Sequence, residues 1–191
     1  MTVGAIVLAA GLSRRMGSNK LLAPLDGKPL VTHAVDAALD AGLPVLVVTG
    51  HDAGAIRAAL GDRAIDFVDA PDHAQGMGRS IAAGIDAVDR DGGDWDAAII
   101  CLGDMPRIRP ELLKALAAEA APDAILIPSF AGRRGNPVLW GKAHFAGLAA
   151  LQGDKGGRAL FVDRPVRELP WQDDGIFADV DTPEMLATLT R

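Results

Sequence analysis

The chain has 191 residues, a length that suits one domain with its own hydrophobic core. Its 25 acidic residues outnumber its 19 basic ones, and the net charge is −6. This balance argues against a general nucleic-acid-binding protein, because such proteins are usually basic. The single cysteine, Cys101, excludes an internal disulfide and a multi-cysteine zinc site.

The N-terminal segment MTVGAIVLAAG has no basic region, and its apolar run is only five to eight residues long. Such a run is too short for the apolar part of a signal peptide with its cleavage site, and far too short to span a bilayer. We therefore expect a cytoplasmic protein without a membrane partner.

Short, nearly continuous apolar runs predict strands that are buried on both faces of a parallel sheet. In chain order these runs are Val3–Leu8, Val45–Thr49, Ile65–Val68, Ala97–Leu102 and Ala124–Ile127. Between them, apolar residues recur at helical spacing. The helical segments contain Leu30 to Leu39 before Gly42, Ile56 to Leu60 before Gly61, Ile81 to Val88, Leu112 to Leu116 after Pro110, and a last helix that Thr182-Pro183 opens.

This alternation of strands and helices predicts a three-layer α/β/α sandwich with right-handed crossovers, formed by one domain over residues 1–191. The segment Ser129–Trp140 interrupts the alternation with glycines, an asparagine and a proline, and predicts a hairpin-like insertion of two short extended pieces. Ligands of open α/β sheets bind beyond the carboxyl ends of the strands. Three loops emerge there.

The first loop, Leu8 to Lys20, reads LAAGLSRRMGSNK. Its small residues, Ala9, Ala10 and Gly11, let a ligand approach the backbone. Arg14, Arg15 and Lys20 then follow without an intervening acid, and form the local basic cluster that a polyphosphate needs. The alternative is a solvated basic loop beside the sheet.

Two familiar nucleotide motifs are missing. Gly11 and Gly17 enclose five residues instead of four, and Ser18 stands where a P-loop has lysine. The one G-x-G sequence, Gly76 to Gly78, has Ile81 in place of the third glycine of a dinucleotide fingerprint. A dinucleotide-dependent oxidoreductase is therefore disfavoured.

The second loop, Gln75 to Ser80, precedes the third predicted helix. Its glycines and Ser80 can offer backbone N–H groups and a hydroxyl to a nucleotide, or can form a flexible turn with a helix cap. The third loop, Leu102 to Pro106, places Asp104 just after a buried strand, where a carboxylate suits magnesium.

A second candidate carboxylate is Asp181, in the sequence ADVDTP. We expect residues 178–181 to be extended, with Asp179 and Asp181 on one side of a strand. For each aspartate the alternative is a capping or turn role. The glycine-rich stretch Gly153–Gly157, with Asp154 and Arg158, can close over an acceptor. The tryptophans Trp95, Trp140 and Trp171 are scattered and predict no stacking platform.

Six segments, in this order and spacing, resemble the molybdenum cofactor nucleotidyltransferases: LAAGLSRRMGSNKLL, QGMGRSIAAG, GDMP, RGNPVLW, GDKGGR and DVDTPE. The resemblance covers essentially the whole chain. The first motif and GDMP are shared with the wider nucleotidyltransferase superfamily, and the later motifs are similar to the molybdopterin cytidylyltransferase branch.

The resemblance implies a Rossmann-like nucleotidyltransferase fold with a mostly parallel sheet, and the substrates CTP and molybdopterin with Mg2+ as cofactor. CMP would be joined to the terminal phosphate of the molybdenum-bound pterin, and pyrophosphate would leave. A transient contact with a molybdoenzyme is also implied. Guanylyl-transferring relatives carry a second glycine where this chain has Ala10, which favours CTP.

The resemblance also implies site residues. The nucleotide would be held by Leu8, Ala9, Ala10, Gly11, Arg15, Lys20, Gly78 and Ser80. Arg15, Lys20 and Asp104 would be catalytic, and Asp104 and Asp181 would hold the metal. Asn136, Pro137 and Arg158 would bind the acceptor. The alternatives are a guanylyltransferase, a transferase with another phosphate acceptor, and a non-catalytic carrier of the molybdenum cofactor.

Overall fold

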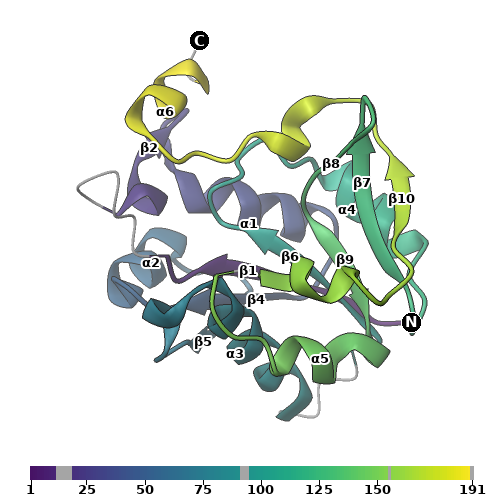
Figure 1. Ribbon diagram of the computed structural model, residues 1–191. Coiled ribbons are helices and arrows are strands. Elements are labelled where there is room, and N and C mark those ends of the chain that lie inside the picture. The colour runs from purple at the N-terminus through teal and green to yellow at the C-terminus, as the bar shows by residue number, and fades with distance from the viewer. Residues whose placement is uncertain (12–18, 91–94, 155, 190–191) are drawn as a thin grey trace.

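The computed structural model describes residues 1–11, 19–90, 95–154 and 156–189. Over these residues the main sheet has eight strands (Figure 1). In chain order they are β1 (Val3–Ala9), β4 (Val45–Thr49), β5 (Asp66–Asp69), β6 (Ala97–Leu102), β7 (Ile125–Phe130), β8 (Arg133–Arg134), β9 (Val138–Gly141) and β10 (Arg167–Pro170). A separate two-stranded ribbon pairs β2 (Pro24–Leu25) with β3 (Lys28–Pro29).

Within the described ranges, six α-helices connect and cover the strands. They are α1 (Leu30–Asp40), α2 (Ala53–Leu60), α3 (Met77–Arg90), α4 (Pro110–Ala118), α5 (Phe145–Ala149) and α6 (Pro183–Leu189). Short 3-10 helices are η1 (Lys20–Leu22), η2 (His73–Gln75), η3 (Lys142–His144), η4 (Gly156–Phe161) and η5 (Asp174–Phe177). No helix in these ranges is both long and apolar enough to cross a bilayer.

The strand order in the main sheet is β10-β7-β9-β6-β1-β4-β5, and β8 pairs with β7. β1 lies in the interior of the sheet and is parallel to both of its neighbours, β4 and β6. Its side chains alternate between two cores. Val3, Ala5, Val7 and Ala9 face the core that α1, α2 and α4 cover, whereas Ile6 faces the core of α3 and α5. In Figure 1 the latter two helices lie below the sheet. The predicted three-layer sandwich is therefore confirmed.

The segment Ser129–Trp140 forms the two predicted extended pieces, but they separate. β8 folds back on β7 as a hairpin. β9, in contrast, enters the main sheet and runs antiparallel to both β6 and β7. All of its residues are buried, which explains why this apolar run joins the sheet instead of staying in the insertion.

The expected strand at residues 178–181 is wrong. η5 ends at Phe177, and the chain then crosses the end of the sheet without joining an edge. A backbone hydrogen bond from the Val180 N–H to the Asp104 carbonyl, at 3.0 Å, ties it to the turn after β6. The Val180 side chain is fully buried against Leu25 and Leu30, so this anchor to a separate small core replaces a strand ladder.

Candidate active site

The carboxyl ends of β1 and β6 lie against each other. The Gly103 N–H donates a hydrogen bond to the Leu8 carbonyl at 3.0 Å. A Cβ on Gly103 would lie only 2.9 Å from that same oxygen, so this close approach requires glycine. The contact brings the turn after β1 next to the turn that carries Asp104. In the first turn, Ala9 and Ala10 are buried and Gly11 is exposed.

Lys20 links two aspartates that are remote in the sequence. Its Nζ donates to Asp104 Oδ2 at 2.6 Å and to Asp181 Oδ1 at 2.8 Å. Lys20 begins η1, where the Asn19 side chain accepts a hydrogen bond from the Leu21 N–H. The Lys20 and Asp104 side chains are only 14% and 17% exposed, whereas that of Asp181 is 39% exposed. The three charges form one compact cluster, which we call the acid pair with its lysine.

Asp181 is held from both sides along the chain. On one side, Val180 is anchored to the backbone of Asp104. On the other, the Thr182 hydroxyl accepts a hydrogen bond from the Met185 N–H and caps α6, as the sequence predicts. These two contacts hold Asp181 in place although residues 178–181 do not form a strand.

Burial and charge act against each other in this cluster. Burial raises the pKa of Asp104 above the ordinary carboxyl value, Lys20 lowers it, and the charge of Asp179 raises it further. Burial alone lowers the pKa of Lys20, but the charges and hydrogen bonds of Asp104 and Asp181 outweigh it, so that this pKa is raised. The lysine is therefore held in its charged form.

The donor set fits a divalent cation. Asp104 Oδ1 is buried and has no hydrogen-bond partner within the part of the chain that the structure describes. Such an oxygen is costly unless something binds it. The same residues contain no group of three or more histidine, cysteine or acidic side chains arranged to hold a metal. Magnesium commonly takes only one or two carboxylates and completes its shell with water and substrate phosphates, so two aspartates suffice.

The second loop begins α3 at Met77. The sequence predicts that the Gly78 N–H is available to a nucleotide. In the structure this N–H donates a hydrogen bond to the Gly153 carbonyl at 2.9 Å. Ser80 lies in the first turn of α3 and is 6% exposed. The glycines of this loop therefore serve a second purpose, which is to let the 152–154 loop lie directly on the start of α3.

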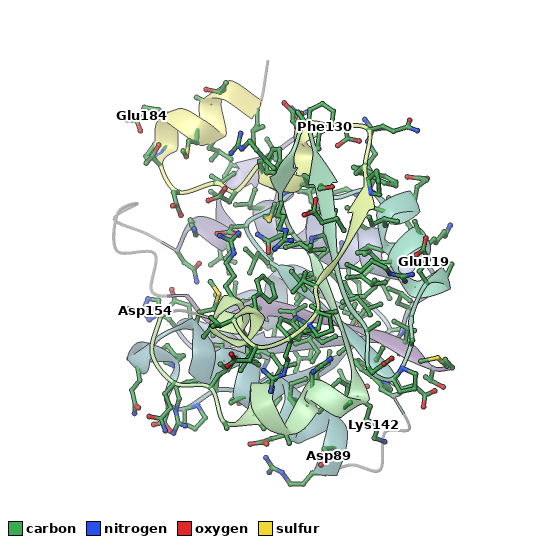
Figure 2. All side chains as sticks on the ribbon, turned by 45° about the vertical axis from the view of Figure 1, so that its right-hand side comes forward. Asp89, Glu119, Phe130, Lys142, Asp154 and Glu184 are labelled. Atoms are coloured by element: carbon green, nitrogen blue, oxygen red, sulfur yellow. The ribbon has the colours of Figure 1, made fainter. Side chains whose placement is uncertain are left out.

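A pocket of about 310 Å³ lies between residues of β6, β9, α3 and η4, and we call it the acceptor pocket. Two predicted acceptor residues, Asn136 and Arg158, line it together with Asp154, which Figure 2 labels on the loop before η4. Pro137 is buried next to Asn136 and is not part of the lining. The remaining wall is Met77, Ile81, Ile100, Leu102, Val138, Trp140, Gly156, Gly157 and Phe161. Leu102 stands two residues before Asp104, so the pocket extends to the carboxyl end of β6, after which Asp104 follows.

Some features of the site were not predictable from residue types. Trp140 is not an isolated tryptophan, because its ring stacks on Phe161 with centroids 5.5 Å apart and forms a wall of the pocket. Phe161 also lines the pocket and belongs to none of the six segments, and Met77 lies in the second segment but has no predicted role. Arg15 lies outside the described residues, so its predicted place at the triphosphate stays a prediction.

The sequence and the structure were compared with known protein families, sequences and structures, and these comparisons agree on a family. The family model described as a MobA-like NTP transferase domain matches residues 5–168. The purine catabolism protein PucB of Bacillus subtilis is 30% identical over 198 residues, which cover 94% of this chain and 91% of PucB. The crystal structure of Rv0371c from Mycobacterium tuberculosis has a TM-score of 0.87 at 28% identity, and the match covers 100% of this chain and 98% of that one.

Two further structures refine this comparison. Rv0371c has also been crystallised in complex with manganese, and this structure matches with a TM-score of 0.85 at 27% identity over 100% of this chain and 98% of that one. The molybdopterin-guanine dinucleotide biosynthesis protein A of Archaeoglobus fulgidus has a TM-score of 0.71 at 21% identity, over 100% and 97% of the two chains. That similarity supports the fold alone. The predicted Rossmann-like nucleotidyltransferase fold is confirmed.

Proposed function

Since the chain belongs to the MobA-like NTP transferase domain family, we propose that it transfers CMP from CTP to the phosphate of molybdenum-bound molybdopterin. The products are molybdopterin cytosine dinucleotide and pyrophosphate. One observation carries the proposal: Leu102, two residues before Asp104 of the acid pair, lines a pocket together with two of the three predicted acceptor residues, Asn136 and Arg158. A transferase needs this arrangement, because nucleotide and acceptor must meet at one point.

Asp104 and Asp181 would hold the magnesium ion, with the unpartnered Asp104 Oδ1 as one ligand. The ion would neutralise charge on the triphosphate and make the α-phosphorus more electrophilic. When all three side chains are ionised, the acid pair with its lysine carries one excess negative charge. A divalent cation reverses that sign and makes the cluster suitable for a polyphosphate.

The remaining chemistry is positioning. An oxygen of the acceptor phosphate forms a bond to the α-phosphorus, and the bond from that phosphorus to the bridging oxygen of pyrophosphate breaks. Both partners are anions, so their repulsion is the main obstacle. Lys20 and Arg15 would hold the phosphates and balance the charge that develops on the leaving pyrophosphate. No covalent nucleophile is required.

The nucleotide would lie along Leu8, Ala9, Ala10 and Gly11, with Gly78 and Ser80 at the base and ribose. Because the Gly78 N–H already bonds to Gly153, we assign Gly78 a steric role, and Ser80 provides the hydroxyl. Ala10 would favour CTP. Its methyl group is buried between the ends of β1 and β4, where a Cβ on Gly50 would lie 2.9 Å from it. Replacing Ala10 with glycine would open that space for a larger base.

The acceptor would occupy the pocket beside Asn136, Pro137 and Arg158. The product would then pass to a molybdoenzyme through a transient contact. Magnesium, CTP and the pterin are thus the three components whose binding tests this function.

Calorimetry is the first test. CTP and then GTP are titrated, with magnesium present, into the wild type, Asp104→Ala and Ala10→Gly. We expect magnesium-dependent binding of CTP in preference to GTP, weakened in Asp104→Ala, with the preference reduced in Ala10→Gly. Preference for GTP in the wild type would retain the transferase and make it a guanylyltransferase. If no triphosphate binds, the enzyme proposal is wrong and a carrier of the cofactor takes its place.

A further inference from the structure

The acceptor pocket contains three polar side chains that have no side-chain partner in the part of the chain that the structure describes. Asn136, Asp154 and Arg158 line it among apolar groups. Within residues 1–11, 19–90, 95–154 and 156–189, none of these side chains forms a hydrogen bond or an ion pair. Asp154 and Arg158 carry opposite charges but are not paired with each other. By contrast, Asp72 on the surface near this loop is paired with Arg79 at 2.9 Å.

The loop that carries Asp154 is nevertheless anchored through its backbone. The hydrogen bond from the Gly78 N–H to the Gly153 carbonyl holds its loop on the start of α3. The carboxylate lies over Gly76, where a Cβ would be 2.5 Å from Asp154 Oδ1. The backbone of the loop is thus held beside the start of α3, and its carboxylate has no hydrogen-bond partner among the described residues. A group that is positioned but has no partner is suited to bind a ligand.

The chemistry of the pocket specifies the ligand. Ile100, Val138 and the stacked rings of Trp140 and Phe161 form apolar walls suited to a flat heteroaromatic ring. An ionised carboxylate only accepts hydrogen bonds, so its complement is a ring edge with two adjacent N–H donors. The 2-amino-4-oxopyrimidine edge of a pterin presents its 2-amino group and its N3–H side by side. Cytosine has no such pair of donors, whereas guanine does.

We propose that Asp154 is the residue that selects the acceptor, by accepting two hydrogen bonds from the 2-amino-4-oxopyrimidine edge of its pterin ring. This assignment rests on the proposed function for the identity of the acceptor. Arg158 lies in the same lining and supplies the positive charge for the acidic part of that molecule. Asp154 thereby distinguishes the acceptor from pteridines that lack the 2-amino group.

The test uses two simple ring compounds, pterin and lumazine. Lumazine has a carbonyl in place of the 2-amino group of pterin. Each is titrated into the full chain with magnesium and CTP present, and its fluorescence is followed. Loss of a charge-assisted pair of hydrogen bonds changes affinity by about 10- to 100-fold. We therefore expect the wild type to bind pterin at least about tenfold more tightly than lumazine, and Asp154→Asn to lose this discrimination.

The matched control is Asp163→Asn, which removes the same charge from an exposed residue outside the pocket lining. We expect it to bind both compounds as the wild type does. Equal binding of pterin and lumazine by the wild type, no measurable binding of pterin, or equal effects of the two variants would each overturn the proposal. If Asp154→Asn weakens GTP but not pterin, the carboxylate recognises guanine and the proposal is also wrong.

The outcome is separable from the proposed function. An assay of CMP transfer to molybdopterin reports the reaction, whereas the titrations report ring recognition. Pterin binding that depends on Asp154 without CMP transfer would support the inference and contradict the transferase. CMP transfer with pterin binding independent of Asp154 would support the transferase and contradict the inference.

Discussion

The acid pair with its lysine and the acceptor pocket satisfy their polar groups in opposite ways. Lys20 and Asp104 are mostly buried, and Lys20 binds both Asp104 and Asp181. In the acceptor pocket, Asp154 and Arg158 are exposed and, among the described residues, have no protein partner. Buried charges must be compensated within the protein before a substrate arrives, whereas water compensates exposed ones until a ligand replaces it. The two halves of the site should therefore respond differently to substitution.

The largest effect is expected at Asp104. Asp104→Asn keeps the shape of the side chain but removes the charge that Lys20 and the metal need. We predict a fall in kcat for nucleotide transfer of about 10²- to 10³-fold, the loss typical for one electrostatic group at a reaction centre. Steady-state kinetics measures the fall, and circular dichroism verifies the fold.

Asp179→Asn is the control for that experiment. Asp179 is exposed, and its charge acts on Asp104 without binding Lys20. We expect less than about a tenfold change in kcat. If the two variants lose activity equally, activity depends on the total negative charge around the site, and the specific position of Asp104 is not required.

A structural substitution tests how the acceptor pocket is built. Gly76 has φ = +117°, and a Cβ there would lie 2.4 Å from the carbonyl carbon of Gly153. We predict that Gly76→Ala lowers the free energy of unfolding by about 2 kcal/mol, because the backbone conformation and the loop contact are both lost. Urea unfolding measures the change.

Gly54→Ala is the control for this substitution. A Cβ on Gly54 in α2 would have nothing within 4 Å, so the variant should be more stable by about 0.5 to 1 kcal/mol. An unchanged midpoint for Gly76→Ala would show that the loop does not lie on α3 in solution.

The difference between the two regions also explains what the sequence can predict. Strands β4 and β6 have the predicted bounds, because their continuous apolar runs permit no other arrangement. The place of Asp104 is also predictable, since it lies two residues after such a strand, at the edge where ligands bind. The ion pair of Lys20 with Asp181 is not predictable in this way, because Asp181 follows no strand and is held near Asp104 by the backbone hydrogen bond of Val180.

The acceptor pocket is less predictable. Its wall depends on β9 entering the main sheet between β6 and β7, which no local pattern indicates. Trp140 and Phe161 meet only because of that insertion. The expected strand at residues 178–181 is wrong for a related reason: alternating polar and apolar residues favour a strand, but burial of Val180 in a separate small core decided the backbone path. Tertiary contacts override local patterns where a segment crosses the end of the sheet.

A smaller effect is expected at Lys20. In the absence of nucleotide, its ammonium group competes with a metal ion for both carboxylates. We predict that Lys20→Gln binds Mn2+ about tenfold more tightly when no nucleotide is present, a change of about 1.4 kcal/mol, and binds CTP more weakly. Electron paramagnetic resonance of free Mn2+ measures the first effect and calorimetry the second. Lys28→Gln, at a lysine that pairs with Asp36 away from the site, should change neither. Weaker Mn2+ binding by Lys20→Gln would contradict the competition.

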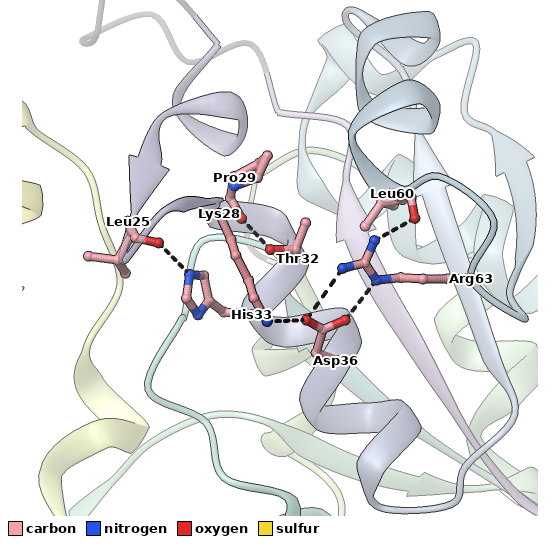
Figure 3. A network of polar contacts seen from close by, with 8 residues as sticks. All are labelled: Leu25, Lys28, Pro29, Thr32, His33, Asp36, Leu60 and Arg63. Atoms are coloured by element: carbon pink, nitrogen blue, oxygen red, sulfur yellow. Dashed lines mark hydrogen bonds and ion pairs between the residues drawn. The ribbon is translucent and has the colours of Figure 1, made fainter.

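The smallest effect is expected at Asp36, which belongs to neither region of the site. It measures how much an ion pair alone contributes to the free energy of unfolding. Asp36 on α1 binds Arg63 at 2.7 Å and Lys28 at 3.2 Å (Figure 3). Partial burial alone raises the pKa of Asp36, but the hydrogen bonds from Arg63 and Lys28 outweigh it and lower the pKa below 3.8. We predict that Asp36→Asn lowers the free energy of unfolding at pH 7 by about 0.5 to 1 kcal/mol, as for other partly exposed ion pairs.

The lowered pKa of Asp36 determines how the stability difference between wild type and variant changes with pH. A carboxyl whose pKa is lower in the folded state contributes stability above its unfolded value, and loses it as the pH falls through the folded value. The difference between wild type and Asp36→Asn should therefore be full at neutral pH and shrink below pH 3.8. Asp86→Asn, which removes an exposed pair with Arg90 at 4.0 Å, should change stability little at any pH. A constant difference for Asp36→Asn down to pH 2 would mean that the amide disturbs the packing of α1, and that the ion pair contributes nothing.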